Sequence, residues 1–211
     1  MFDGTLSDSA QNALAILGKT GLFTESYMAG GSALALHLGH RKSFDLDFYT
    51  RNALHAPQLA KDLEHSGTFE TTLLQPPHTL LGIFNGTKFS IFRYDYPMLD
   101  DFSVFRNINI ASVKDIAAMK LSAVTGRAAK RDYVDIYMIS QQYSLETQLD
   151  WFKQKFGNFE NLCYSVIKSL QYFDDVDDDV MPQMEKPLDW EIVKTFLANE
   201  ALKLGHKIIG V

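Results

Sequence analysis

The stretch "GGSALALHLGHRKSFDLDFYT", residues 30–50, decides the fold. It continues the short apolar run "SYMAG", and a glycine pair between an apolar run and a segment of helix formers is typical of a tight strand-to-helix turn. "SALALHLG" predicts a helix that ends at Gly39, and "FDLDFYT", residues 44–50, alternates apolar and polar residues as a strand does. We therefore expect strand, turn, helix and strand in close succession.

Two carboxylates lie one residue apart in the second of these strands. Side chains of a strand alternate between its faces, so Asp45 and Asp47 are expected on one face and Phe44, Leu46 and Phe48 on the other. Two acids on one face repel each other unless the face is solvated or binds a cation. Mg²⁺ prefers one or two carboxylates together with substrate phosphates, so the pair predicts a magnesium site.

The glycine turn that precedes the helix can serve a phosphate. Glycines at this position let backbone N–H groups approach a phosphate, and the helix N-terminus adds a favourable dipole. Gly30, Gly31 and Ser32 fit this role, although such a turn by itself more often only satisfies backbone geometry. Followed by a carboxylate pair on the next strand, it indicates metal-assisted phosphoryl chemistry.

The remaining sequence divides into an α/β half and a helical half. "SDSAQNALAILGKTG" predicts a first helix, and "PQLAKDLEHS" predicts another that begins at Pro57. "TFETTLLQ", "HTLLGIF" and "KFSIFRYDY" predict three strands, the last two joined by an Asn85-Gly86 hairpin. From Ser112 onward only helices are expected, the first being one helix over "SVKDIAAMKLSAVTGRAAKRDYVDIYMISQQ". We expect an α+β fold with domains 1–110 and 111–211.

Composition excludes several classes of protein. The chain has 211 residues, 46% of them hydrophobic, which is ample for a packed core. A formal charge of −6 does not suit a protein that binds specific duplex DNA, and no apolar run is long enough to span a bilayer. The single cysteine, Cys163, and an N-terminus without a signal-peptide pattern indicate a cytoplasmic protein.

Two motifs together resemble a known family. "GGSALALHLGHRKSFDLDF" looks like the signature of the DNA polymerase β-like nucleotidyltransferase superfamily, a Gly-Ser turn followed by an Asp-x-Asp strand. With "KLSAVTGRAAKRDYVDIY" in the helical half, the chain is similar to the AbiEii/AbiGii-type nucleotidyltransferase toxins of bacterial abortive-infection systems. The resemblance covers about Tyr27 to Tyr143 and implies a nucleotidyltransferase-fold mixed sheet followed by a helical bundle that completes the active-site cleft.

The resemblance also implies roles for the first motif. Gly31 and Ser32, with Gly30 before them, would hold the phosphates of a nucleoside triphosphate substrate, and Asp45 and Asp47 would hold Mg²⁺, with Mn²⁺ as the alternative. Arg41 lies between the turn and the strand, where it could reach the nucleotide's phosphates or be plain surface charge.

The second motif would supply Lys120, Arg127 and Asp132. Lys120 and Arg127 are seven residues apart, close to two helical turns, so one helix could present both to the phosphates of a triphosphate or an RNA. Asp132 could orient a basic residue or act as a general base. Ion pairing within the helix is the structural alternative.

The sequence departs from the superfamily at a third carboxylate. This acid commonly lies on a later strand, here "TKFSIFRYDY", and strand alternation places its position on Ser90. A serine does not bind magnesium as a carboxylate does, and Asp95 lies further along the chain, where only a bulge could re-aim it. Full catalytic competence is therefore an open question at Ser90.

The leading hypothesis is a magnesium-dependent enzyme that transfers a nucleoside monophosphate to RNA, with tRNA the first candidate, or to protein. The resemblance implies the toxin of a type IV-like toxin–antitoxin pair in phage defence, with an antitoxin that acts without having to bind it. The first alternative is a non-catalytic relative that binds nucleotide or RNA. A small-molecule enzyme of the antibiotic-modifying kind shares the first motif, but "KLSAVTGRAAKRDYVDIY" argues against it.

Two other segments have competing interpretations. "DDVDDDV", residues 174–180, reads as a solvated acidic linker that could meet a basic partner. A set of aromatic residues at roughly helical spacing fits a buried stripe better than a base-stacking surface: Trp151, Phe152, Phe156, Phe159, Tyr164 and Tyr172.

Overall fold

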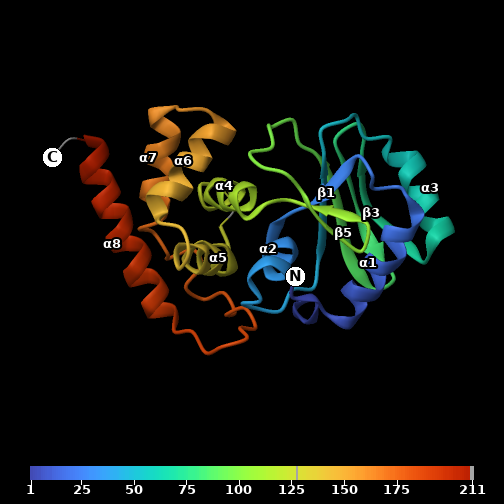
Figure 1. The fold of residues 1–211 in the computed structure, drawn as a ribbon, viewed down its shortest axis with the longest axis horizontal. Helices are drawn as coiled ribbons and strands as arrows, with labels where there is room; N and C mark the ends of the chain where they lie inside the picture. The colour runs from blue at the N-terminus through green and yellow to red at the C-terminus, as the bar shows by residue number, and fades with distance from the viewer. Residues whose placement is uncertain (127, 210–211) are drawn as a thin grey trace. The chain divides into compact units, whose positions relative to one another are not determined.

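The computed structural model describes residues 1–126 and 128–209. The chain forms two compact units, the first from Met1 to Ser112 and the second from Val113 onward. The first is an α/β unit and the second consists of helices and their connecting loops (Figure 1). The fold class is α+β with a helical C-terminal region, as the sequence predicts.

The first unit is built on a seven-stranded mixed sheet with the strand order β3-β4-β5-β2-β1-β7-β6. The central strand β2 runs antiparallel to β1 and parallel to β5. The strands are β1 (Ser26–Met28), β2 (Leu46–Thr50), β3 (Phe69–Gln75), β4 (Thr79–Phe84), β5 (Thr87–Arg93), β6 (Ser103–Phe105) and β7 (Ile108–Ile110).

One face of this sheet is covered by α1 (Asp8–Thr20) and α3 (Ala56–Ser66), which also contact each other (Figure 1). Apolar side chains of the central strands are buried there, with Phe48 and Phe89 at exposures of 0% and 2%. The Phe23 ring lies 4.4 Å from that of Phe48. By alternation, Asp47 and Tyr49 of β2 point to the opposite face.

Local sequence rules explain the ends of α1 and confirm the predicted Asn85-Gly86 hairpin. Ser7 caps α1 by accepting a hydrogen bond from the Ala10 N–H, and Gly21 ends the helix in the left-handed conformation. The hairpin between β4 and β5 turns at Asn85 and Gly86, whose φ angles of 47° and 78° are both positive, as a type I′ turn requires.

The strand predicted over residues 44–50 is shorter than expected. β2 begins at Leu46, and the Phe44 side chain is 53% exposed instead of facing the core. The reason is a backbone contact just upstream: the Ser43 N–H donates to the Thr5 carbonyl at 2.8 Å, and the Ser43 carbonyl accepts from the Ser7 N–H at 3.0 Å. The segment before β2 is therefore bound to the N-terminal segment, and Asp45 lies before the start of the strand.

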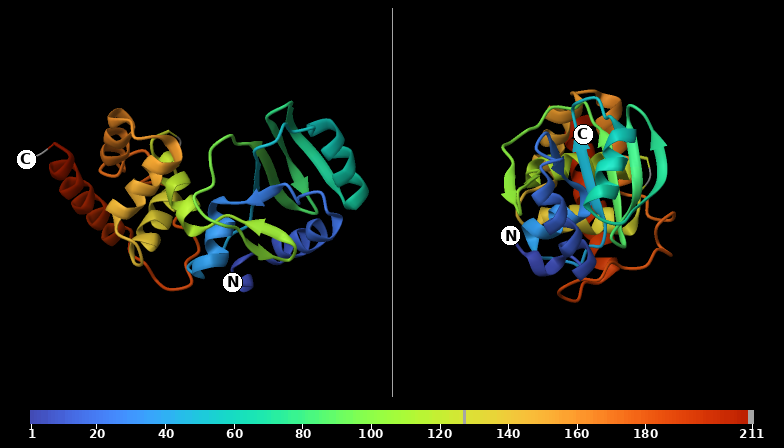
Figure 2. Two further views of the ribbon diagram at one scale, coloured as in Figure 1. Left: turned by 45° about the horizontal axis from the view of Figure 1, so that its top comes forward. Right: turned by 90° about the vertical axis from the view of Figure 1, so that its right-hand side faces the viewer.

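The second unit contains α4 (Val113–Val124), α5 (Lys130–Ser140), α6 (Leu145–Phe156), α7 (Glu160–Ser169) and α8 (Trp190–Ile209). The long α8 lies beside α5, α6 and α7 (Figures 1 and 2). The prediction of one helix from Ser112 to Gln142 is wrong, because α4 ends at Val124. The chain then turns, with hydrogen bonds from the Thr125 and Gly126 N–H groups to carbonyls three residues back.

The two ambiguous segments also have definite positions in this unit. Phe152 is buried at 3% exposure, but Phe159, Tyr164 and Tyr172 are 62%, 61% and 49% exposed, so the prediction of a fully buried aromatic stripe is wrong for these three. The acidic segment contacts basic groups of its own chain: the Lys130 ammonium donates to the carbonyls of Asp177 and Asp179, at 2.7 and 2.6 Å.

Candidate active site

The glycine turn brings the start of α2 (Gly30–Leu38) against β2. Gly30 has a φ of +72°, and a Cβ built on it would lie 3.2 Å from Asp47 Oδ2. A side chain at this position would be strained by its backbone conformation and would crowd the carboxylate. Glycine therefore lets the positive N-terminal end of a helix approach Asp47 closely; phosphate binding at this turn stays a prediction.

Ser32 is held inside the protein. Its side chain is 1% exposed, and its hydroxyl lies 2.9 Å from Ser43 Oγ and donates to the backbone carbonyl of Asp45. This bond ties the first turn of α2 to the segment that carries Asp45. The hydroxyl would have to exchange this acceptor in order to donate to a phosphate, so side-chain binding of a phosphate by Ser32 stays a prediction.

Arg41 is buried, at 4% exposure, and is not plain surface charge. Its Nη1 donates to the Lys42 carbonyl at 3.0 Å, and its guanidinium occupies the space that a Cβ on Gly31 would need. A guanidinium beside the first turn of α2 adds its charge to the positive end of the helix dipole. Both features favour an anion at this place.

The carboxylate pair lies where β2 begins. Asp47 is directly opposite Ser90 in the parallel pairing of β2 with β5, and Ser90 Oγ donates to Asp47 Oδ1 at 2.5 Å. Asp45 is half-buried, and within the described residues its side chain makes no hydrogen bond or ion pair. The two acids therefore differ, because Asp47 is oriented by a neighbouring strand and Asp45 is open to a cation.

Ser90 is the neighbour of Asp47 on the next strand, the place at which alternation predicts the third acid. Asp95 does not replace it, because β5 ends at Arg93 and Asp95 pairs with the Arg93 guanidinium at 3.0 Å. Five residues of extended chain separate Asp95 from Ser90, about 16 Å. Within the described residues there is no cluster of three or more His, Cys, Asp or Glu side chains that could hold a metal.

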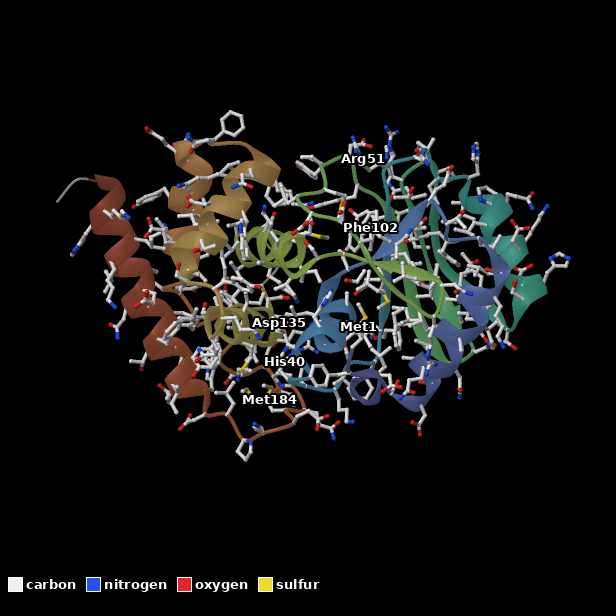
Figure 3. The ribbon with its side chains drawn as sticks, viewed as in Figure 1. Met1, His40, Arg51, Phe102, Asp135 and Met184 are labelled. Carbon is white, nitrogen blue, oxygen red and sulfur yellow. The ribbon has the colours of Figure 1, made fainter. Side chains whose placement is uncertain are left out.

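The second motif forms a buried cluster of charges between α4 and α5. Lys120 Nζ lies 2.6 Å from Asp132 Oδ1 and 2.7 Å from Asp135 Oδ2, and the exposures of the three residues are 6%, 9% and 0%. Asp132 Oδ2 also accepts from the Ala129 N–H at the start of α5. The ion pairs join two helices, so they are not pairs within one helix. Asp135 lies on α5 (Figure 3).

Arg127 lies outside the described residues, between α4 and α5. The prediction that it shares a helix face with Lys120 therefore also falls outside the described residues; α4, which carries Lys120, ends at Val124. Its part in binding a nucleotide stays a prediction from the resemblance.

Two ion pairs of the helical unit were not predicted from the sequence, one of them fully buried. Lys155 Nζ pairs with Asp115 Oδ1 at 2.8 Å, and both side chains are 0% exposed. Asp177 in the acidic segment accepts from Trp190 Nε1 at 2.7 Å and pairs with Lys194, and these hydrogen bonds lower the pKa of its carboxyl. Residues that form pairs across 40 positions in sequence leave no local pattern by which they could be recognised.

Comparisons with known proteins assign the chain to a family. Residues 84–207 match the family model described as nucleotidyl transferase AbiEii toxin of a type IV toxin–antitoxin system. The matched range includes the second motif and Ser90 but not the glycine turn or the Asp-x-Asp strand. An uncharacterized protein of Aquifex aeolicus (strain VF5) is 31% identical over 205 residues, which cover 92% of this chain and 95% of that protein.

Solved structures share the fold at low sequence identity. JHP933 from Helicobacter pylori has a TM-score of 0.54 at 19% identity, over 97% of this chain and 98% of that one. MenT4, a nucleotidyltransferase toxin of Mycobacterium tuberculosis, has a TM-score of 0.60 at 13% identity, over 91% and 80% of the two chains.

No helix among residues 1–126 and 128–209 has the length and apolar composition of a membrane span. The family match covers more than half of the chain, which therefore belongs to the AbiEii nucleotidyltransferase toxin family.

Proposed function

We propose that this nucleotidyltransferase transfers a nucleoside monophosphate from a nucleoside triphosphate to RNA, with tRNA as the first candidate acceptor and protein as the alternative, and that it requires Mg²⁺. One observation carries the proposal: the glycine start of α2 lies against Asp47, with Asp45 just upstream on the same chain segment. A place suited to phosphates thus adjoins a place suited to a divalent cation.

The residues present fit magnesium rather than an ion caged entirely by protein. Mg²⁺ is usually bound through one or two carboxylates and completes its shell with waters and substrate phosphates. Asp45 offers a carboxylate without a protein partner among the described residues, and Asp47 offers one oriented by Ser90. When bound, the cation would neutralise charge on the triphosphate and on the attacking oxygen; Mn²⁺ is the alternative ion.

The protein's own groups would position the reactants. The N–H groups at Gly30 and Gly31, with Ser32 and Arg41, would bind the phosphates that leave as pyrophosphate. The acceptor's hydroxyl oxygen bonds to the α-phosphorus, the bond from that phosphorus to the β-phosphate oxygen breaks, and the hydroxyl proton passes to water. The two oxygens and the α-phosphorus lie roughly in line during the transfer.

Lys120 would neutralise charge that develops on the phosphates, together with Arg127. Both oxygens of Asp132 already accept hydrogen bonds, from Lys120 and from the Ala129 N–H. This arrangement supports a role for Asp132 in orienting Lys120 rather than in taking the acceptor's proton. We further propose that the helical domain contributes these groups to the same reaction, as the resemblance implies.

In the cell, we propose that the protein acts in the cytoplasm as the toxin of a toxin–antitoxin pair in abortive infection by phage. Family membership supports the toxin role and a cognate antitoxin. The antitoxin is proposed to act indirectly, without binding to the toxin.

The direct test is transfer of label from each of the four α-³²P-labelled nucleoside triphosphates, with magnesium, to total tRNA and to total protein. We expect the wild type to label one acceptor class from a preferred nucleotide and Asp47→Ala to label neither. Labelling by Asp47→Ala at the wild-type rate would contradict the proposed site.

A second candidate function is binding of nucleotide or RNA without transfer. The observation that favours it is the Ser90 hydroxyl at the position opposite Asp47, where the superfamily commonly has a third acid. This candidate predicts that the wild type binds triphosphate in the presence of magnesium and transfers no label to either acceptor.

A further inference from the structure

Six aromatic side chains form a continuous row on the sheet face that carries Asp47. We propose that this row is a stacking surface for the unpaired bases at the end of an RNA acceptor, an inference that rests on the proposed transfer to RNA. The row, called here the aromatic platform, consists of Tyr27, Tyr49, Phe92, Tyr94, Tyr96 and Phe102.

Strand register places the platform next to the carboxylates. Asp47 pairs with Ser90, and two residues further along the same strands Tyr49 pairs with Phe92. Tyr27 of β1 is opposite Tyr49 on the other side. Positions two residues apart on a strand share a face and lie about 6.6 Å apart, so the platform begins one such step from Asp47.

The rings are arranged for stacking and reach the surface at both ends. The Tyr27 ring is stacked between Tyr49 and Phe102, with centroids 5.8 and 5.3 Å away and interplanar angles of 22° and 28°. Tyr94 contacts Tyr49 at 5.3 Å and Tyr96 at 4.8 Å. Phe102, labelled in Figure 3, is 40% exposed and Tyr96 is 43% exposed. A further planar ring can therefore extend the row at the Phe102 end.

The direction of the reaction assigns the platform to the acceptor. In the proposed reaction pyrophosphate leaves toward the start of α2, where Gly30 adjoins Asp47. The attacking hydroxyl approaches from the opposite side, because the transfer is in line. β2 runs from Leu46 at the α2 end to Thr50, with Tyr49 beyond Asp47. The platform therefore lies on the side from which the acceptor arrives.

The chemistry of the platform favours bases over phosphates. The loop between β5 and β6 carries Asp100 and Asp101 beside Phe102, which would repel an RNA backbone, while the exposed Arg51 directly after β2 can contact one phosphate. Stacking on aromatic side chains tolerates any base, since every base has a π-face. An acceptor whose terminal bases are unpaired matches these features better than a folded protein surface does.

The test compares binding of two probes to the full chain: a fluorescein-labelled single-stranded hexamer of adenylate, and ATP, both with magnesium. Phe102→Leu keeps an apolar side chain but removes the π-face, and Phe102→Trp restores one. Tyr164→Leu is the matched control, because Tyr164 is an equally accessible aromatic on α7, 61% exposed. Circular dichroism and Tm confirm that each variant is folded.

We expect Phe102→Leu to weaken hexamer binding roughly 5- to 150-fold, the range for loss of stacking on one base. Phe102→Trp and Tyr164→Leu should bind the hexamer as the wild type does, and ATP binding should be unchanged in all three. Three outcomes would overturn the proposal: wild type that does not bind the hexamer, Phe102→Leu with wild-type hexamer affinity, or Phe102→Leu that weakens ATP and hexamer equally. The last would assign the platform to the base of the triphosphate.

The binding measurement separates this proposal from the proposed function. Wild type that binds the hexamer through Phe102 but transfers no label would contradict the reaction and leave the platform supported. Label transfer to protein alone, with the same activity in Phe102→Leu, would contradict the platform and leave the transferase supported.

Discussion

Ser90 and Asp47 are the two residues on which the proposed chemistry most depends. The Ser90 hydroxyl donates to Asp47 Oδ1 at 2.5 Å, so a neutral donor orients Asp47. A carboxylate at the position of Ser90 would instead repel Asp47. A neutral donor orients the carboxylate that we propose binds Mg²⁺, and it does not compete for the cation. The site as it stands is therefore suited to a cation held by two acids and substrate phosphates.

Replacing Ser90 with aspartate should couple the stability of the first unit to magnesium. Ser90→Asp places two like charges opposite each other, which is destabilising by about 1 kcal/mol in a sheet. We expect the Tm in EDTA to fall by about 4 °C, and saturating Mg²⁺ to reverse this fall. Ser90→Asn is the uncharged control, and an equal response of both variants to Mg²⁺ would show that no cation lies beside Asp47.

His37 makes folding of the first unit sensitive to acid. Burial lowers the pKa of its imidazole below 6.5, and its Nε2 lies 2.8 Å from the Ala111 carbonyl oxygen. The unfolded chain binds the proton more readily than the folded one, so the unfolding free energy should fall as the pH falls through 6.5. Urea midpoints from pH 7.5 to 5 should depend less on pH in His37→Gln than in the wild type. His78→Gln, at an exposed histidine, should keep the wild-type pH dependence.

At the scale of elements, the hairpin of β6 and β7 is the part of the sheet that the sequence analysis missed. Its two-residue turn consists of Arg106 and Asn107, with φ angles of 49° and 62°. Positive φ at both positions is usual for Asn-Gly, which marked the other hairpin at Asn85-Gly86, but not for arginine. Tertiary contacts hold this turn: Arg106 Nη1 donates to the Gln11 carbonyl at 2.8 Å, and Gly18 of α1 leaves room for the Arg106 carbonyl.

Gly18 should therefore resist substitution although it lies inside a helix. A Cβ on Gly18 would overlap the Arg106 carbonyl oxygen, a backbone atom that cannot rotate away. Gly18→Ala should destabilise the protein by about 1–3 kcal/mol, the usual result of overpacking. Gly205→Ala on α8 is the matched control, since its Cβ would meet Ile167 Cγ2 at an ordinary 3.7 Å. There the higher helix propensity of alanine should stabilise by up to about 1 kcal/mol. Chemical denaturation measures both; equal effects would contradict this packing.

Strand alternation and turn residues predicted most of the first unit, because these are local signals. They placed Ser90 on the face where it meets Asp47, and they gave both strands of the Asn85-Gly86 hairpin. Local signals failed where contacts between distant segments determine the backbone conformation. Ser43 forms backbone hydrogen bonds with the N-terminal segment, and β2 therefore begins only at Leu46. The end of α4 at Val124 was not predicted, because the sequence pattern indicates a helix through this point.

For the molecule as a whole, charge limits how the proposed RNA acceptor could be bound. The chain has 26 acidic and 20 basic residues, so an extended phosphate-binding surface is not expected. Near the aromatic platform the exposed Arg51 could contact one phosphate, which predicts a slope of about −0.7 in log affinity against log salt concentration for a single strand. Hexamer binding measured from 50 to 300 mM KCl tests this, and a much steeper slope would indicate a basic surface elsewhere.

The measurement that tests the account most directly is release of pyrophosphate by the full chain with its preferred triphosphate and acceptor, titrated with Mg²⁺. Glu64→Gln is the control for Asp47→Asn, because both substitutions exchange a carboxylate for an amide. Glu64 is exposed on α3, which packs on the face of the sheet opposite Asp47. We predict that one pyrophosphate is released for each nucleotide transferred and that release requires Mg²⁺. Glu64→Gln should release pyrophosphate at the wild-type rate, and in Asp47→Asn the rate should fall roughly 100-fold or more. Mg²⁺-dependent release that persists in Asp47→Asn would contradict the assignment of Asp47 to the reaction.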